Sequence, residues 1–154
     1  MKFKNMVVAT LAIGLSTAAL AQSIGKAEDQ IRWRQSAYHT MAWNMGRIKA
    51  NIDGTYNKDQ VIQAANAIQA IANSGMGVLF QPGTDKGKGW KETRVKGELF
   101  TDKEGVGKVA KPYMEAANEM AKVAAAGDIA AIKTQFGKLG ETCKGCHDKF
   151  RKED

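Results

Sequence analysis

Cysteine is scarce in this sequence: its 154 residues include only two, Cys143 and Cys146. Two cysteines can form at most one disulfide bond, so a framework of several disulfides is excluded. Proline is equally scarce, with two residues, and the chain contains neither an internal repeat nor a low-complexity tract. These absences favour a domain stabilised by an ordinary hydrophobic core, without covalent cross-links.

The first 21 residues have the features of a secretory signal peptide. Two lysines form a basic start, an apolar run covers residues 6–20, and residues 19–21 (Ala-Leu-Ala) match a signal-peptidase site. The apolar run is shorter than the ~20 residues that span a bilayer, which argues against a membrane anchor. We therefore predict a cleaved signal peptide over residues 1–21, export to the periplasm, and one mature domain over residues 22–154 with no membrane attachment.

The mature chain carries a moderate net positive charge. The formal net charge is +7 for the whole chain and +5 without Lys2 and Lys4, the only charged residues of the signal peptide. A basic balance can favour nucleic-acid binding, but an exported protein does not meet nucleic acid in its compartment. We therefore expect no nucleic-acid partner, and we attribute the charge to solubility.

Residues 143–147 read Cys-Lys-Gly-Cys-His, the attachment pattern of c-type haem. Two thiols three residues apart lie on one side of a helix, where they can add to the two vinyl groups of one porphyrin edge. The adjacent imidazole then faces the iron as its proximal ligand. The pattern predicts one covalently bound haem c, attached through Cys143 and Cys146, with His147 as the iron ligand.

Two other uses of these residues are less favoured. A thioredoxin-like redox pair would follow a strand in a βαβ pattern, and no strand pattern precedes the motif. A zinc site would need His39 as well as Cys143, Cys146 and His147. Because Cys146 and His147 are adjacent, they suit a closed tetrahedral site poorly.

Any sixth iron ligand must come from upstream, because no methionine follows His147. Met41 and Met45 are candidates, but methionine at helical spacing is more often core filler. His39 is rotated by about 100° around the helix from its neighbour Tyr38. We therefore expect His39 to face solvent or a partner subunit.

Apolar residues recur at helical spacing in four segments, which predicts an all-α fold. Asn57 is the expected N-cap of the second helix and Asp128 that of the fourth. Pro112 should either bend the third helix or start it. In the fourth helix both cysteines lie on the core-facing stripe. The segments cover about residues 26–49, 58–73, 106–123 and 129–150.

The connections between these segments indicate how the helices are arranged. Residues 51–56 form a short link with an Asp-Gly turn signal, which favours antiparallel neighbours. Residues 75–100 form a long connection rich in glycine and lysine, typical of a crossing segment with local structure or of a functional loop. We predict an up-and-down antiparallel four-helix bundle with the haem in its core.

The sequence resembles the cytochrome c′ family of class II c-type cytochromes over essentially the whole mature chain. The resemblance is carried by the motif at residues 143–147 and by the run Ile-Arg-Trp-Arg-Gln-Ser-Ala-Tyr at residues 31–38. Arg151, one turn beyond His147, completes the C-terminal signature.

The resemblance implies roles for four further residues. Arg34 and Gln35 would lie at the haem propionates, and Arg151 would lie beside the proximal histidine. Tyr38 would occupy the distal side of the iron without binding it.

The resemblance also implies a function. The iron would be five-coordinate, with a crowded distal pocket that admits nitric oxide and carbon monoxide but discriminates against oxygen. Homodimers would form through the first two helices. We expect a protein that binds and sequesters nitric oxide, without enzymatic activity, since no distal histidine-arginine arrangement is apparent for peroxidase chemistry. The alternative is a one-electron carrier with a closed, six-coordinate haem, whose redox partner protein the sequence does not identify.

Overall fold

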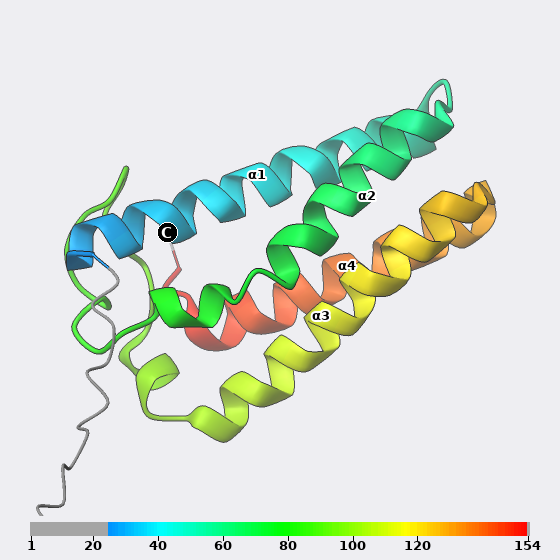
Figure 1. Cartoon of the computed structure of the whole chain (residues 1–154). Helices are drawn as coiled ribbons and strands as arrows, with labels where there is room; N and C mark the ends of the chain where they lie inside the picture. The colour runs from blue at the N-terminus through cyan, green and yellow to red at the C-terminus, as the bar shows by residue number, and fades with distance from the viewer. Residues whose placement is uncertain (1–24, 154) are drawn as a thin grey trace, which may run out of the picture.

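The computed structural model describes residues 25–153, so the predicted signal peptide lies outside the described residues. The chain folds into four α-helices that run alternately in opposite directions (Figure 1). Within residues 25–153 there is no β-strand, only two isolated β-bridges. The predicted all-α four-helix bundle is confirmed. The helices are α1 (Ala27–Asp53), α2 (Lys58–Ala72), α3 (Lys103–Ala126) and α4 (Ile129–Phe150).

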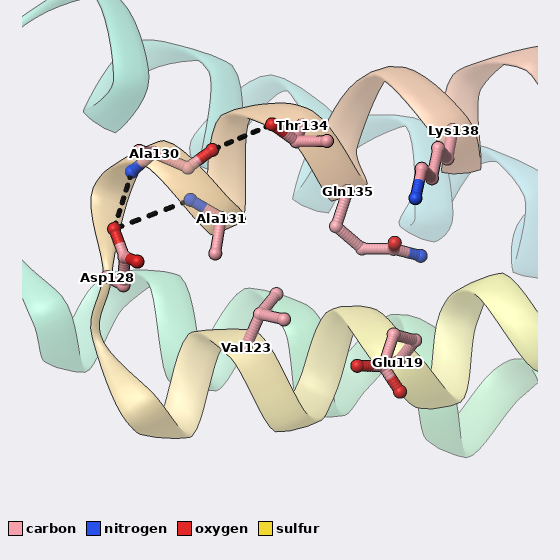
Figure 2. Close-up of a pocket in the computed structure, with 8 residues that line it drawn as sticks. All are labelled: Glu119, Val123, Asp128, Ala130, Ala131, Thr134, Gln135 and Lys138. Atoms are coloured by element: carbon pink, nitrogen blue, oxygen red, sulfur yellow. Dashed lines mark hydrogen bonds between the residues drawn. The ribbon is translucent and has the colours of Figure 1, made fainter.

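Side-chain caps begin three of the helices. Asn57 accepts a hydrogen bond from the backbone N–H of Gln60 at the start of α2. Asp102 caps α3, and Asp128 caps α4 by accepting from the first backbone N–H groups of that helix (Figure 2). Gly127, in the left-handed conformation at φ 84°, ends α3 directly before this cap. The polar residues that flank the apolar stripes therefore fix the helix boundaries.

Helix α1 continues one turn beyond its predicted end near residue 49. Asn51, which is buried, supports this turn because it bonds to both helices. Its amide donates to the Arg47 carbonyl and to Gln60 Oε1, and its carbonyl oxygen accepts from the Asn57 backbone N–H at 2.7 Å. The extension results from tertiary contacts, which helical periodicity does not reveal.

Pro112 lies inside α3 and does not start it. Proline cannot donate a backbone hydrogen bond to the residue four positions earlier, here Lys108. Pro112 and Lys108 are both exposed, so water can reach this side of the helix. The helix therefore continues through the proline, and Tyr113, the next residue, points partly inward.

The hydrophobic core occupies the half of the bundle that contains the α1–α2 and α3–α4 connections (Figure 1). On α4 it includes Ile132 and Leu139, while Ile129, which the stripe predicted to be buried, is 43% exposed in the first turn. Both cysteines lie beyond Leu139, towards the other half. The buried members are Ile48, Val61, Ala64, Ala65, Ile68, Ala117, Met120, Ala124, Ile132 and Leu139.

The long connection between α2 and α3 runs across the end of the bundle where α1 begins and α4 ends (Figure 1). It contains two short 3₁₀ helices, η1 (Met76–Leu79) and η2 (Gly97–Phe100). The expectation of a crossing segment with local structure is confirmed. No helix in the described part of the chain is long and apolar enough to span a bilayer.

Candidate functional site

The two thiols lie on α4, just past the last core layer. Cys143 and Cys146 are half-buried, and neither forms a disulfide. Burial raises the pKa of both thiols, and the neighbouring Cys143 raises that of Cys146 further. A raised pKa is the opposite of what a reactive redox pair requires. Together with the missing strand before the motif, this argues against the thioredoxin-like alternative.

His147 follows on the same helix and faces a recess of about 290 Å³ at the surface. Although the residue is exposed, burial of its imidazole and then the charge of Arg94 lower its pKa. The ring is therefore neutral at pH 7, which is the form that binds a metal. Arg151 lines the same recess, and its backbone N–H donates to the His147 carbonyl at 3.0 Å. The structure thus brings Arg151 and His147 together.

Tyrosines from two other helices lie close enough to the thiols to interact with them electrostatically. Burial and then the proximity of Cys146 raise the pKa of Tyr38, on α1, to about 12. Burial, Cys143 and Tyr38 raise the pKa of Tyr113, on α3. Water reaches 42% of the Tyr38 surface, so the side chain is only partly covered by the protein. Side chains of α1, α3 and α4 therefore converge on one region.

The two candidate methionine ligands differ in their surroundings. Met41 is 7% exposed, and its sulfur accepts a hydrogen bond from the Tyr113 hydroxyl at 2.6 Å. Met45 packs against the hydrophobic core, as expected of core filler. His39 is exposed, in agreement with the sequence-based expectation. Of these residues, only Met41 has its donor atom bonded to a residue that neighbours the thiols.

Arg34 joins α1 to the long connection. Its guanidinium is almost fully buried, at 2% exposure, and burial lowers its pKa. It donates to the Leu79 carbonyl at 3.2 Å, to Thr84 Oγ1 at 2.7 Å and to Thr93 Oγ1 at 2.8 Å, and it also donates to the Thr84 carbonyl. Phe80 covers the guanidinium, 4.8 Å from the ring centroid. These bonds hold the long connection between α2 and α3 against α1, and we call this set of bonds the Arg34 clamp.

Gln35 binds the same connection further along. Its carbonyl oxygen accepts from the Trp90 backbone N–H at 2.8 Å, and its amide donates to the Lys91 carbonyl at 2.9 Å. The place of Arg34 and Gln35 at the haem propionates stays a prediction. Sequence reasoning missed Thr84, which is 2% exposed and the main partner of Arg34. The only local signal for it is the preceding Pro-Gly turn at residues 82–83.

A short backbone strap holds the end of α4 next to His147. Val95 and Arg151 form an antiparallel bridge. The Lys96 N–H donates to the Phe150 carbonyl at 2.8 Å, and the N–H of residue 152 donates to the carbonyl of residue 94 at 2.8 Å. This pairing, with Phe150 buried beneath it, fixes the turn that follows His147.

Replacing Lys96 with proline should weaken this strap selectively. Lys96 has φ −74°, which proline adopts without strain, and Val95 before it forms a bridge with extended backbone. The variant loses the N–H donor to Phe150 and also the exposed ammonium bond to the Asp148 carbonyl, which the control below measures separately. For the loss of the N–H donor we expect the free energy of unfolding in urea to fall by about 1 kcal/mol. Amide hydrogen exchange at Lys152 should become faster.

The matched control is Lys96→Ala. It keeps the backbone N–H and loses the ammonium bond to the Asp148 carbonyl, which is 3.1 Å long and exposed. We expect a change within about 0.5 kcal/mol. Equal losses in the two variants would show that the backbone strap does not stabilise the end of α4.

A recess between α3 and α4 lies at the other end of the bundle and is separate from this site (Figure 2). Its volume is about 610 Å³, and Glu119 and Lys138 line it without any cysteine or histidine. Gln135, the buried amide at its floor, donates to the Ala116 carbonyl at 2.9 Å and is therefore already paired.

The donor set at the end of α4 fits a covalently bound haem. Cys143 and Cys146 are one turn apart on the inward face, the neutral imidazole of His147 comes next, and aromatic side chains of α1 and α3 face the thiols. Within residues 25–153, no three histidine, cysteine or acidic side chains are grouped to hold a metal ion by themselves. The zinc alternative therefore has no support.

Comparison with known proteins agrees with this chemistry. The model of the family Cytochrome C′ matches residues 29–151. A cytochrome c′ of Rhodocyclus tenuis is 62% identical over 130 residues, covering 84% of this chain and 98% of the relative. A cytochrome c′ of Allochromatium vinosum is 53% identical over 141 residues, covering 92% of this chain and 91% of the relative.

Solved structures of related sequence have the same fold as this chain. A cytochrome c′ with an unusual ligand-controlled dimer dissociation superposes with a TM-score of 0.81 at 54% identity, covering 84% of this chain and 98% of the other. A nitric oxide complex of a variant of cytochrome c′ from Alcaligenes xylosoxidans superposes with a TM-score of 0.75 at 26% identity, covering 84% and 98%.

Proposed function

This chain belongs to the cytochrome c′ family and carries covalent haem c, and we propose that it binds nitric oxide, and also carbon monoxide, in the periplasm. The haem supplies an iron that can coordinate a diatomic gas. Cys143 and Cys146 attach it, and His147 ligates the iron from one side. The observation that carries the proposal is the closeness of Tyr38, on α1, to the two thiols that would hold the haem, because a bulky side chain there would restrict the entry of a gas.

Roles for the surrounding residues are part of the proposal. Tyr38 restricts access to the iron without ligating it, because a phenol is protonated at neutral pH and burial favours that form further. Arg151 lies beside His147, and Arg34 and Gln35 reach the propionates from α1. The nitric oxide complex of a related cytochrome c′ supports the choice of gas. Sequestration of nitric oxide, without catalytic turnover, then protects the cell.

Dimer formation through α1 and α2 is part of the proposal. Trp43 on α1 is 62% exposed, and the Arg47 guanidinium lies 5.0 Å from the centroid of its ring. Tryptophan is enriched in protein–protein interfaces relative to the rest of the protein surface. The ligand-controlled dimer dissociation of a related cytochrome c′ gives further support. Sedimentation of the holoprotein as a monomer at every concentration would contradict this part.

Absorption spectra of the ferric and ferrous holoprotein, with and without nitric oxide, test the function. High-spin bands in both oxidation states and a spectral shift on adding the gas are the expected result. Low-spin bands that ignore the gas would mean that a protein side chain closes the sixth position. The protein would then be a one-electron carrier.

Truncating Tyr38 to alanine should increase the association rate of carbon monoxide with the ferrous protein. Removal of the ring opens the path to the iron, so we expect at least a tenfold faster rate, about 1.4 kcal/mol off the entry barrier. Stopped-flow mixing or flash photolysis measures it. Tyr56→Ala, at the other end of the bundle, is the control, since its hydroxyl bonds to the distant Gly127 carbonyl. An unchanged rate in Tyr38→Ala would show that the ring is core filler.

A further inference from the structure

A buried methionine near a haem iron is a potential ligand. Thioether sulfur is a soft donor, and methionine opposite histidine is a common axial pair in electron-carrying c-type cytochromes. Met41 meets the structural requirement, because it is buried on α1 and lies three residues, nearly one turn, beyond Tyr38. If the Met41 sulfur were free to ligate, it could fill the sixth coordination position of the iron.

The Met41 sulfur is already engaged. It accepts a hydrogen bond from the hydroxyl of Tyr113, which belongs to α3. A hydrogen bond to sulfur uses a lone pair of the same kind that a metal would take, so the sulfur offers less to the iron while the bond lasts. The bond joins α1 to α3 across the bundle, and Tyr113 lies close enough to Cys143 for the thiol to influence its pKa.

Tyr113 is well suited to hold this bond permanently. It is partly buried directly after Pro112 on α3, and burial raises the pKa of its hydroxyl. The phenol therefore keeps its proton, and can donate it, across the physiological pH range. Met45, the other methionine on this side of α1, packs into the hydrophobic core and does not compete.

We propose that Tyr113 is a positioning residue that keeps the sixth coordination position open by holding the sulfur of Met41 in a hydrogen bond. The proposal rests on the proposed function, since it explains why a buried methionine does not close a site that binds gas. The hydroxyl group of Tyr113 then favours gas binding over electron transfer. Neutral hydrogen bonds of this kind shift a two-state equilibrium by roughly three- to tenfold.

The test uses Tyr113→Phe in the full-length holoprotein, which removes the hydroxyl and keeps the ring. We expect a low-spin component with thioether ligation in the absorption and electron paramagnetic resonance spectra. If one wild-type molecule in ten is closed, a three- to tenfold shift closes about a quarter to a half of the molecules, so the apparent carbon monoxide affinity should fall by up to about twofold. Adding Met41→Leu to this variant should restore the high-spin spectrum and the affinity.

The control is Tyr56→Phe, which removes a tyrosine hydroxyl at the other end of the bundle, where it bonds to Gly127. It should leave the spin state unchanged. If the wild type is high-spin and Tyr113→Phe stays fully high-spin, the inference is wrong while the proposed function stands. A low-spin component that persists in Tyr113→Phe/Met41→Leu would also overturn it, because the ligand would not be Met41. A low-spin wild type would overturn the proposed function itself.

Discussion

Replacing Arg34 with lysine should lower the free energy of unfolding by about 3 kcal/mol. Nη1 of the guanidinium donates to the Leu79 carbonyl and Thr84 Oγ1, and Nη2 donates to the Thr84 carbonyl and Thr93 Oγ1. An ammonium group is a compact charge with three donors and cannot reproduce this planar fork. Each buried acceptor left without a partner costs about 1–3 kcal/mol. Urea unfolding of the holoprotein measures the loss.

Arg32 provides a matched control on the same helix. Its guanidinium lies 5.2 Å from the centroid of the Trp90 ring and pairs with Asp29 at 3.7 Å, and both of those carboxylate and guanidinium side chains are well exposed. An exposed ion pair contributes little and an exposed cation–π contact about 0.5–1 kcal/mol, so Arg32→Lys should change the free energy of unfolding by no more than about 1 kcal/mol. Equal losses in the two variants would contradict the clamp.

The predicted place of Arg34 at a haem propionate is tested by a different quantity. A charge near a propionate influences the reduction potential of the iron, whereas a clamp on the connection influences the unfolding free energy. Because lysine keeps the positive charge, this test uses alanine: a potential that shifts in Arg34→Ala but not in Arg32→Ala would support the propionate role. An unchanged potential beside a large loss of stability would leave Arg34 with the clamp alone.

The helices could be predicted because their signals are local. The capping side chains Asn57 and Asp128 lie where the apolar stripes begin, and the stripe on α4 places both cysteines on its inner face. The exceptions occur at helix ends. Ile129, the first residue of α4, is exposed, and α1 continues because Asn51 bonds across to α2.

The contacts between helices could not be predicted from the same signals. Helical period tells which side chains face inward, but not which of them meet, since that depends on the rotation and offset of each helix. Tyr113 and Met41 therefore read as two separate core residues. The partners of Arg34 were hidden for a further reason. They lie on a long connection whose path depends on left-handed glycines such as Gly83, at φ 91°.

Truncating Phe150 to alanine should cost about 3–5 kcal/mol of unfolding free energy. The ring is 2% exposed and lies three residues past His147, at the last turn of α4. Its backbone carbonyl also accepts the strap bond from Lys96. Loss of the ring removes the packing beneath this turn, so the orientation of the imidazole should become less defined. We expect a shifted or broadened iron–histidine stretching band in the resonance Raman spectrum of the ferrous holoprotein.

Ile132→Ala separates this local effect from a general loss of stability. Ile132 lies on the same helix, is fully buried, and should cost about 2–5 kcal/mol when truncated. It is eleven residues before Cys143, about 16 Å along the helix axis, so the iron–histidine band should not change. If both variants shift the band equally, the imidazole responds to overall stability. If only Phe150→Ala does, the buried ring and the strap together orient the proximal histidine, and the last turn of α4 is part of the haem site.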